Sequence, residues 1–149
     1  MIRPLLLVSA LVAATLACSC RPGVPNKEKF CNSDVVGVFK IIQKFPDPNK
    51  NNTGGFVHYT QTTHVFKQQN GQPNVPEIAI IRTPQGAACG VDWLQEGKEY
   101  LLNGGFLFEN YPPGVLDIFS CNQLQGSQWD SVNPEIKSAL ENKTYLPCP

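Results

Sequence analysis

Six cysteines are the residues of this sequence best suited to do chemistry, because a thiol can bind a metal, take part in redox exchange or form a disulfide. They are Cys18, Cys20, Cys31, Cys89, Cys121 and Cys148. An even number of cysteines is typical of a disulfide framework when a chain is exported, and on this interpretation we predict three disulfides. Three of the cysteines lie close to the N-terminus and three are spread over the rest of the chain. We expect each early cysteine to pair with a late one, and the sequence leaves the individual partners open.

The closely spaced pair in Cys18-Ser19-Cys20 does not fit a redox or zinc motif. The redox motif has two residues between its cysteines, and a four-cysteine zinc site needs a second pair nearby, which the sequence does not provide. We interpret both cysteines as structural crosslinks.

The two histidines, His58 and His64, are candidate metal ligands. Their even spacing in a predicted strand places both on one face, but the pattern gives them no carboxylate or thiol partner. The helical motif of hydrolytic zinc enzymes is absent from the sequence, as are nucleophile elbows and phosphate-binding glycine loops. We expect surface or cross-strand histidines, no metal or cofactor belonging to the chain itself, and no enzyme activity.

The first seventeen residues have the pattern of a secretory signal peptide. Arg3 precedes an apolar run from Leu5 to Leu16, and the small residue Ala17 follows. The run is too short to cross a bilayer, for which a helix needs roughly 20 residues. Cleavage after Ala17 is favoured, with sites such as Ala14 left open, and it would produce a mature chain of residues 18–149. We predict a single secreted, extracellular domain without a membrane segment.

The charge of the chain is balanced, with 12 basic and 12 acidic residues and no basic block. A nucleic-acid interface normally carries a basic patch, so we expect no nucleic-acid partner. Sequons at Asn51 and Asn142 are candidate N-glycosylation sites. The polar run 46–55 surrounds Asn51, which makes it the better exposed candidate.

Apolar and β-branched runs separated by turn residues predict a fold dominated by β-strands. Residues 35–42 are interpreted as a buried strand, bent or bulged at Gly37, that forms a long hairpin with residues 56–66. Further strands are predicted at 78–81, 100–102 and 115–119, with 106–108 as a candidate between the last two and Gly104-Gly105 as a turn. Five or six such strands favour a closed or partly closed barrel.

One short helix is predicted near the C-terminus. The run Asn-Pro-Glu at 133–135 has the pattern of an N-cap, a first-turn proline and an early acidic residue. Ile136 and Leu140 fall on one face of this helix. A further helical turn is expected at 27–30.

The mature chain would begin Cys-Ser-Cys-Arg-Pro, and further segments extend this pattern. They are Cys31-Asn32-Ser33-Asp34, Thr83-Pro84, Ala88-Cys89-Gly90, residues 97–104, Ile118-Phe119-Ser120-Cys121, Trp129, Thr144-Tyr145 and Cys148. On these segments the sequence resembles the tissue inhibitors of metalloproteinases over essentially the whole mature chain. The resemblance implies a five-stranded barrel of the OB type, also called netrin-like, which agrees with the strand count from the pattern.

The resemblance also implies disulfide partners and a mechanism. The implied disulfides are Cys18–Cys89, Cys20–Cys121 and Cys31–Cys148. The free amine and carbonyl oxygen of Cys18 would chelate the catalytic zinc of a target protease, at the position that such enzymes keep open for water. Ser19 would enter the specificity pocket beside the zinc. The implied contact ridge consists of Cys20, Arg21, Pro22, Ala87, Ala88, Cys89 and Gly90.

The sequence departs from the family pattern in two places. Arg21 replaces the small or apolar residue that is more usual, and the chain stops one residue after Cys148, where vertebrate relatives carry a second subdomain. We expect the inhibitory domain alone, acting as a monomer in a one-to-one complex with a zinc metalloendopeptidase of the matrix metalloproteinase type or a related one. The alternative is a non-inhibitory netrin-like binding module of the extracellular space. A free amine at Cys18 is what separates the two.

Overall fold

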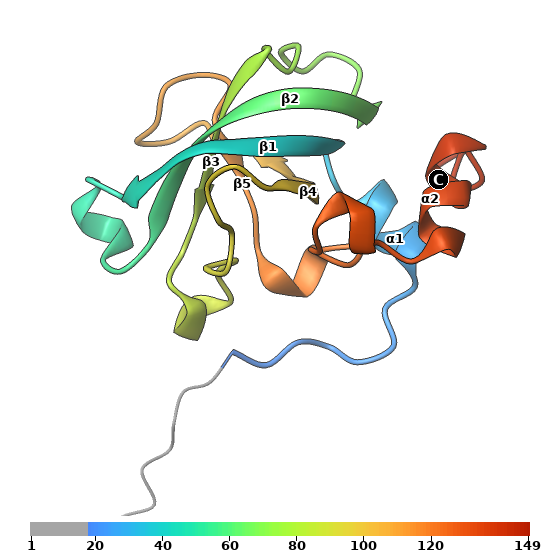
Figure 1. The fold of residues 1–149 in the computed structure, drawn as a ribbon, viewed down its shortest axis with the longest axis horizontal. Helices are drawn as coiled ribbons and strands as arrows, with labels where there is room; N and C mark the ends of the chain where they lie inside the picture. Colours follow the sequence, from blue (N-terminus) through green and yellow to red (C-terminus); the bar gives the residue numbers. More distant parts are fainter. Residues whose placement is uncertain (1–17) are drawn as a thin grey trace, which may run out of the picture.

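The computed structural model describes residues 18–149, so the predicted signal peptide lies outside the described residues. A closed five-stranded barrel forms the body of the molecule, with two short helices beside it (Figure 1). The strands are β1 (Val35–Pro46), β2 (Phe56–Gln68), β3 (Ile78–Thr83), β4 (Glu99–Phe106) and β5 (Leu116–Asp117), and the helices are α1 (Asn26–Cys31) and α2 (Pro134–Glu141). The predicted fold class is confirmed. No helix in this part of the chain has the length and apolar character needed to span a bilayer.

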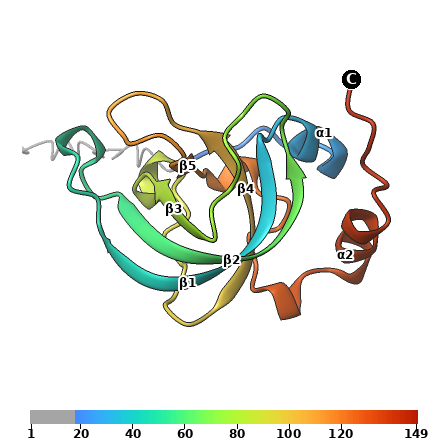
Figure 2. The ribbon, with the colours of Figure 1, turned by 90° about the horizontal axis from the view of Figure 1, so that it is seen from above.

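The barrel closes in the order β1-β2-β3-β5-β4, and β4 pairs back with β1. Neighbouring strands are antiparallel except β3 and β5, which are parallel and share two residue pairs, Ile81 with Leu116 and Arg82 with Asp117. Seen from above in Figure 2, β1 and β2 curve around one side of the barrel and α2 lies outside it. The segments that carry Cys89 and Cys121 leave the barrel at this short seam, after β3 and β5.

The predicted hairpin between the first two strands is confirmed, and it extends beyond its expected ends. β1 pairs with β2 along its whole length, and the register shifts between Val36 and Gly37. The bulge predicted at this glycine is therefore present. A Cβ at Gly37 would lie 2.6 Å from the carbonyl oxygen of His64, so the close approach of the two backbones requires glycine.

The apolar core lies on both sides of β1 and β4. Val35 and Leu102 face the barrel interior, whereas Val36 and Leu101 face a second cluster beside the helices. This second cluster consists of Phe30, Val36, Leu101, Leu124, Val132, Ile136 and Leu140. Strands buried on both faces are continuous apolar runs rather than alternating ones, and this explains the composition of β1.

Both predicted helical segments are present. The side chain of Asn133 accepts a hydrogen bond from the backbone N–H of Glu135 at 2.8 Å, so α2 begins with the predicted cap. The predicted apolar face of α2 is buried. Lys67 of β2 lies at the C-terminal end of α1. Its ammonium group donates to the carbonyl oxygens of Phe30 and Cys31 at 3.0 and 2.9 Å. A cation at this position satisfies carbonyl groups that the helix itself leaves unpaired.

The interpretation of Gly104-Gly105 as a turn is wrong, because both residues belong to β4. The backbone of β5 approaches so closely that a Cβ at Gly104 would lie 2.2 Å from the carbonyl oxygen of Asp117. Close packing of two strands, rather than a change of direction, requires the glycine. The candidate strand at 106–108 is also wrong. Phe106 ends β4, and the Phe108 side chain is 68% exposed.

Of the two positions expected for the histidines, the surface one is wrong for His58, whose side chain is fully buried. The cross-strand one holds, because His58 pairs with Ile81 of β3 and Lys44 of β1. β2 pairs with β3 only as far as Gln61, so His58 lies in the closed part of the barrel wall and the exposed His64 lies beyond it. The His58 Nδ1 atom is 3.3 Å from the carbonyl oxygen of Ile81. Burial lowers the pKa of His58 to about 4, and the charge of Lys44 acts in the same direction. The imidazole is therefore neutral at physiological pH.

Candidate functional site

Disulfides hold the N-terminal segment against the barrel. The pairs are Cys18–Cys89, Cys20–Cys121 and Cys31–Cys148, with sequence separations of 71, 101 and 117 residues. These are the pairs that the resemblance implies, and each joins an early cysteine to a late one. In the chain-entropy model, a crosslink that closes a loop of this length stabilises the fold by about 4 kcal/mol. Figure 1 shows the segment passing below the barrel on its way to α1.

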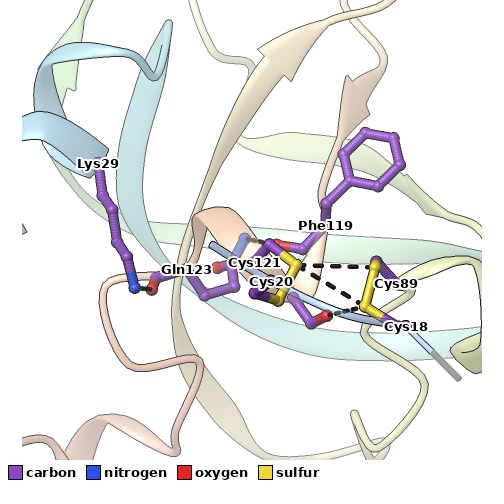
Figure 3. Close-up of a disulfide and its surroundings, with 8 residues drawn as sticks. Cys18, Cys20, Lys29, Cys89, Phe119, Cys121 and Gln123 are labelled. Carbon is purple, nitrogen blue, oxygen red and sulfur yellow. Dashed lines mark hydrogen bonds between the residues drawn. A yellow bond between two sulfur atoms is a disulfide. The ribbon is translucent and has the colours of Figure 1, made fainter. Parts of the chain in front are cut away.

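The first two disulfides lie against each other (Figure 3). The sulfur of Cys121 is 3.7 Å from that of Cys18 and 3.6 Å from that of Cys89, and the four sulfurs lie within 4.8 Å of one another. A second cysteine pair is thus close in space although not in sequence, which corrects the inference from spacing alone. All four sulfurs are bonded in pairs, and a zinc site needs thiolates. The group is a crosslink that joins the N-terminus to two loops.

Ser19 stands between the two crosslinked cysteines and is exposed. Cys18 is half-buried, and Cys20 and Pro22 are exposed like Ser19. Because both neighbours of Ser19 are bonded to the barrel, its backbone has lost most of its freedom on folding. The segment therefore presents a small hydroxyl to solvent from a rigid support.

Arg21 turns toward α1, where its Nη2 atom donates to Glu28 Oε1 at 2.6 Å. The Arg21 side chain is largely exposed and that of Glu28 is partly exposed, and such surface ion pairs contribute little to stability. The contact instead defines where the cation stands, on the α1 side of the N-terminal segment.

The loop that receives Cys18 is a compact turn between β3 and Val91. The carbonyl oxygen of Gln85 accepts hydrogen bonds from the N–H groups of Ala88 and Gly90 at 2.9 and 3.0 Å. Cys89 has a left-handed backbone with φ of 63°. A Cβ at Gly90 would lie 1.7 Å from the carbonyl oxygen of Pro84, so a side chain at this position would force the backbone to move. Ala87 and Ala88 are exposed at the tip, whereas Gly90 is buried beneath them.

The loop that receives Cys20 is held by a buried pair of amide side chains, Asn103 and Gln123. Gln123 Nε2 donates to the carbonyl oxygens of Asn103 and Phe119 at 2.7 and 3.1 Å, and its Oε1 accepts from the Asn103 N–H at 3.1 Å. Lys29 of α1 donates to the Gln123 carbonyl at 3.1 Å (Figure 3). Neither amide is among the site residues predicted from the sequence, because nothing local to either one signals a partner twenty residues away.

A second polar cluster lies where the loop after β1 meets β3 and β5. Asp47 accepts hydrogen bonds from Tyr111 Oη and Asn52 Nδ2, both at 2.6 Å. Arg82 donates to Asp117 at 2.7 Å. Burial acts to raise the pKa of Asp47, but these hydrogen bonds outweigh it and the pKa is lowered, whereas for Asp117 burial prevails and the pKa is raised. The cluster joins the loop after β1 to Tyr111 in the connection between β4 and β5.

The two sequons lie at the surface. Asn51 is exposed in the turn between β1 and β2, and Asn142 is exposed at the end of α2. Asn142 Nδ2 donates to Ser138 Oγ at 3.1 Å. Both positions are accessible to a modifying enzyme, and the use of either one remains a prediction.

A five-stranded OB-type barrel in which Cys18 and Cys20, ahead of the first strand, are crosslinked to two of its own loops is the architecture of a netrin-like domain. A family model described as tissue inhibitor of metalloproteinase matches residues 16–148. The match covers nearly the whole chain, and the chain belongs to this family.

Relatives named as metalloproteinase inhibitors are similar over most of the chain. Metalloproteinase inhibitor 2 of Homo sapiens is 30% identical over 147 residues, which cover 97% of this chain and 63% of that protein. The Rattus norvegicus protein of the same name is 29% identical over 146 residues, with the same coverage. Putative metalloproteinase inhibitor tag-225 of Caenorhabditis elegans is 34% identical over 106 residues, which cover 67% of this chain and 65% of that protein. The chain thus spans less than two thirds of the length of these relatives.

Proposed function

We propose that this chain inhibits a zinc metalloendopeptidase by placing its processed N-terminus, Cys18, on the catalytic zinc of the target. The observation that carries the proposal is the pair of touching disulfides on either side of Ser19. Membership of the family and the names of the relatives support inhibition as the activity. The chelation itself is inferred from the chemistry of the terminus.

The α-amino nitrogen and the carbonyl oxygen of one residue can close a five-membered ring on a metal ion. Catalytic zinc has three protein ligands and an open position for the water that attacks the substrate. In our proposal Cys18 takes this position and displaces the water. The sulfur of Cys18 is bonded to Cys89 and serves to position the chelating atoms, because it is not a free thiolate.

This mechanism requires a free amine at Cys18, which cleavage of the predicted signal peptide after Ala17 would create. Residues 18–149 would then be a secreted netrin-like domain, and three disulfides suit the oxidising compartment that a secreted chain passes through. The chain contributes no cofactor of its own to the complex.

Inhibition should weaken in acid. An α-amino group has a pKa of about 8, and only its deprotonated form can bind a metal. Binding to zinc therefore releases a proton from the protonated amine, and lowering the pH below this pKa opposes zinc binding.

The exposed residues around Cys18 form the proposed contact surface. Ser19 enters the pocket beside the zinc, and the ridge consists of Cys20, Arg21, Pro22, Ala87, Ala88 and Cys89, with the buried Gly90 shaping it from below. The crosslinks order this surface during folding, so little conformational entropy is left to lose on association. We expect a one-to-one complex with a single protease domain.

The test combines N-terminal sequencing of the secreted protein with inhibition of a panel of zinc endopeptidase catalytic domains on a fluorogenic peptide. We expect a mature chain that begins at Cys18 and inhibits. The matched control carries one alanine ahead of Cys18. This variant should keep the three disulfides and lose inhibition. Its free amine belongs to the added alanine, so the amine and carbonyl oxygen of Cys18 can no longer chelate the zinc together.

Two outcomes would favour the alternative, a non-inhibitory extracellular binding module. One is a mature chain that begins before Cys18, and the other is a correctly processed chain without effect on any enzyme of the panel. Retained potency of the alanine-extended protein would contradict the chelation alone.

A further inference from the structure

The side-chain hydroxyl of Thr83 touches the bases of both loops that hold the N-terminal segment. From this geometry we infer that Thr83 is a positioning residue, which sets the relative placement of Cys89 and Cys121 and through them of Cys18 and Cys20. The inference rests on the proposed function, because its consequence is the geometry of the inhibitory terminus.

Thr83 is the last residue of β3 and is fully buried. Its Oγ1 atom accepts a hydrogen bond from the Val91 N–H at 2.7 Å and donates one to the Ile118 carbonyl oxygen at 3.0 Å. Val91 closes the loop that carries Cys89, and Ile118 leads from β5 into the turn that carries Cys121. One hydroxyl therefore uses both its donor and its acceptor capacity to join the two loops.

The position of Thr83 explains why a side chain makes these bonds. The parallel pairing of β3 with β5 ends at Arg82 opposite Asp117, and the Ile118 N–H still donates to the Arg82 carbonyl oxygen at 3.0 Å. Pro84 follows and has no N–H to continue the ladder. The hydroxyl of Thr83 takes over at this point and satisfies a buried carbonyl group that would otherwise have no partner.

Further contacts carry the placement from Thr83 to the cysteines. The Ser120 N–H donates to the Cys89 carbonyl oxygen at 2.8 Å, and the sulfurs of Cys89 and Cys121 are 3.6 Å apart. Figure 3 shows how closely the two disulfides meet at the end of this path. On the other side, Asn52 Nδ2 donates to the Thr83 carbonyl oxygen at 3.3 Å, so the backbone of Thr83 is itself held.

Three substitutions test the assignment. Thr83→Val keeps the shape and removes the hydroxyl, whereas Thr83→Ser keeps the hydroxyl. Thr60→Val is the matched control, because Thr60 is also fully buried in the barrel and its hydroxyl donates to the Ala79 carbonyl oxygen at 2.9 Å, away from both cysteine loops. Each protein is checked for its three disulfides by mass spectrometry and for its thermal unfolding midpoint, and its inhibition constant is measured against one zinc endopeptidase catalytic domain.

We expect Thr83→Val to raise the inhibition constant roughly ten- to hundredfold, the scale of loss when reacting groups are misplaced by about 1 Å. Thr83→Ser should restore it to within about threefold of wild type, a difference of less than 1 kcal/mol by the affinity relation. Thr60→Val should lower the unfolding midpoint and leave the inhibition constant unchanged. Faster amide hydrogen exchange at Val91 and Ser120 should accompany the Thr83→Val effect.

The outcomes separate the two proposals. A wild-type chain that inhibits, together with equal inhibition constants for Thr83→Val and Thr60→Val, overturns the role of Thr83 and leaves the proposed function standing. A wild-type chain that inhibits nothing overturns both. Where Thr83→Val does not form its disulfides, Thr83→Ser decides, and a tenfold rise of its inhibition constant despite the retained hydroxyl overturns the assignment.

Discussion

The sulfur atoms of Cys18 and Cys121 lie 3.7 Å apart although each is bonded to a different cysteine. Thiol–disulfide exchange needs a thiolate within contact of a disulfide sulfur, and here the sulfurs of two intact disulfides already lie at that distance. The native pairing is therefore one of three that the same four sulfurs allow, since all of them lie within 4.8 Å of one another. Which pairing persists depends on all four cysteines being present.

Replacement of one of these four cysteines should therefore produce a mixture of disulfide pairings. In Cys89→Ala the freed thiolate of Cys18 can attack Cys121, which forms a Cys18–Cys121 bond and releases Cys20 as the thiolate. We expect disulfide mapping by mass spectrometry at mildly alkaline pH to find both this bond and the native Cys20–Cys121. The double variant Cys18→Ala, Cys89→Ala should contain Cys20–Cys121 as the single bond at this site, beside Cys31–Cys148. A single stable pairing in Cys89→Ala would show that the contact does not support exchange.

Two glycines of the same loop should respond differently to alanine. A Cβ at Gly90 would meet the backbone carbonyl of Pro84 at 1.7 Å, whereas one at Gly86 would meet the side chain of Asp92 at 2.5 Å. Backbone cannot move away without opening the loop, but a side chain can rotate. We expect Gly90→Ala to lower the free energy of unfolding by about 3 kcal/mol, as overpacking does in a tight site.

Urea unfolding monitored by circular dichroism measures this difference, and Gly86→Ala is the matched control, with a much smaller effect. Inhibition should fall in Gly90→Ala because the loop that carries Cys89 shifts. Equal stability of the two variants would mean that the loop is more adaptable than its hydrogen bonds to Gln85 indicate.

Local signals in the sequence were sufficient for much of the fold. The bulge at Gly37, the hairpin of β1 and β2 and the Asn133 cap of α2 each depend on residues close together in the chain, so pattern and propensity predicted them. The disulfide partners came only with the resemblance, because pairing is decided by distances across the barrel.

The buried polar residues that hold the loops of the candidate site could not be predicted from local signals. Thr83, Asn103 and Gln123 are isolated polar residues whose hydrogen-bond partners lie on other elements, and their burial follows from barrel closure. Gly104 was misinterpreted for the same reason, since the strand that presses on it is remote in sequence. His58 was misplaced because a polar residue in a strand normally faces water, and only the closed wall of β2 and β3 encloses it.

The buried His58 should make the fold sensitive to acid. Its pKa is lowered from 6.5 to about 4 in the folded chain, so between these values the unfolded chain binds a proton that the folded chain does not. Stability from the neutral imidazole is complete above pH 6.5 and is lost as pH falls toward 4. A shift of this size corresponds to about 3 kcal/mol in the free energy of unfolding.

Urea unfolding at a series of pH values measures this slope. His58→Asn keeps a donor for the Ile81 carbonyl but cannot titrate, so its free energy of unfolding should fall less steeply between pH 6.5 and 4. His64→Asn is the control, because His64 is exposed and its replacement should leave the wild-type slope. Carboxylates such as Asp47 contribute equally to all three proteins. An identical slope in His58→Asn would show that the imidazole is hydrated or protonated in the folded chain.

Ser19 should govern which proteases are inhibited without governing whether zinc is bound. Its side chain is exposed between two anchored cysteines, so its replacement leaves the disulfides and the chelating atoms of Cys18 in place. Ser19→Gly removes a hydroxymethyl group from the pocket, and Ser19→Leu adds apolar volume that a deep pocket accepts and a shallow one excludes. A pocket discriminates a missing or added group of this size by about 1 to 3 kcal/mol.

Inhibition constants across a panel of zinc endopeptidases should therefore change unequally for the two variants. Ser138→Ala on α2 is the control, and its inhibition constants should be unchanged. Constants that shift by the same factor for every enzyme would place Ser19 outside the pocket, and the terminus would then approach the zinc in another orientation.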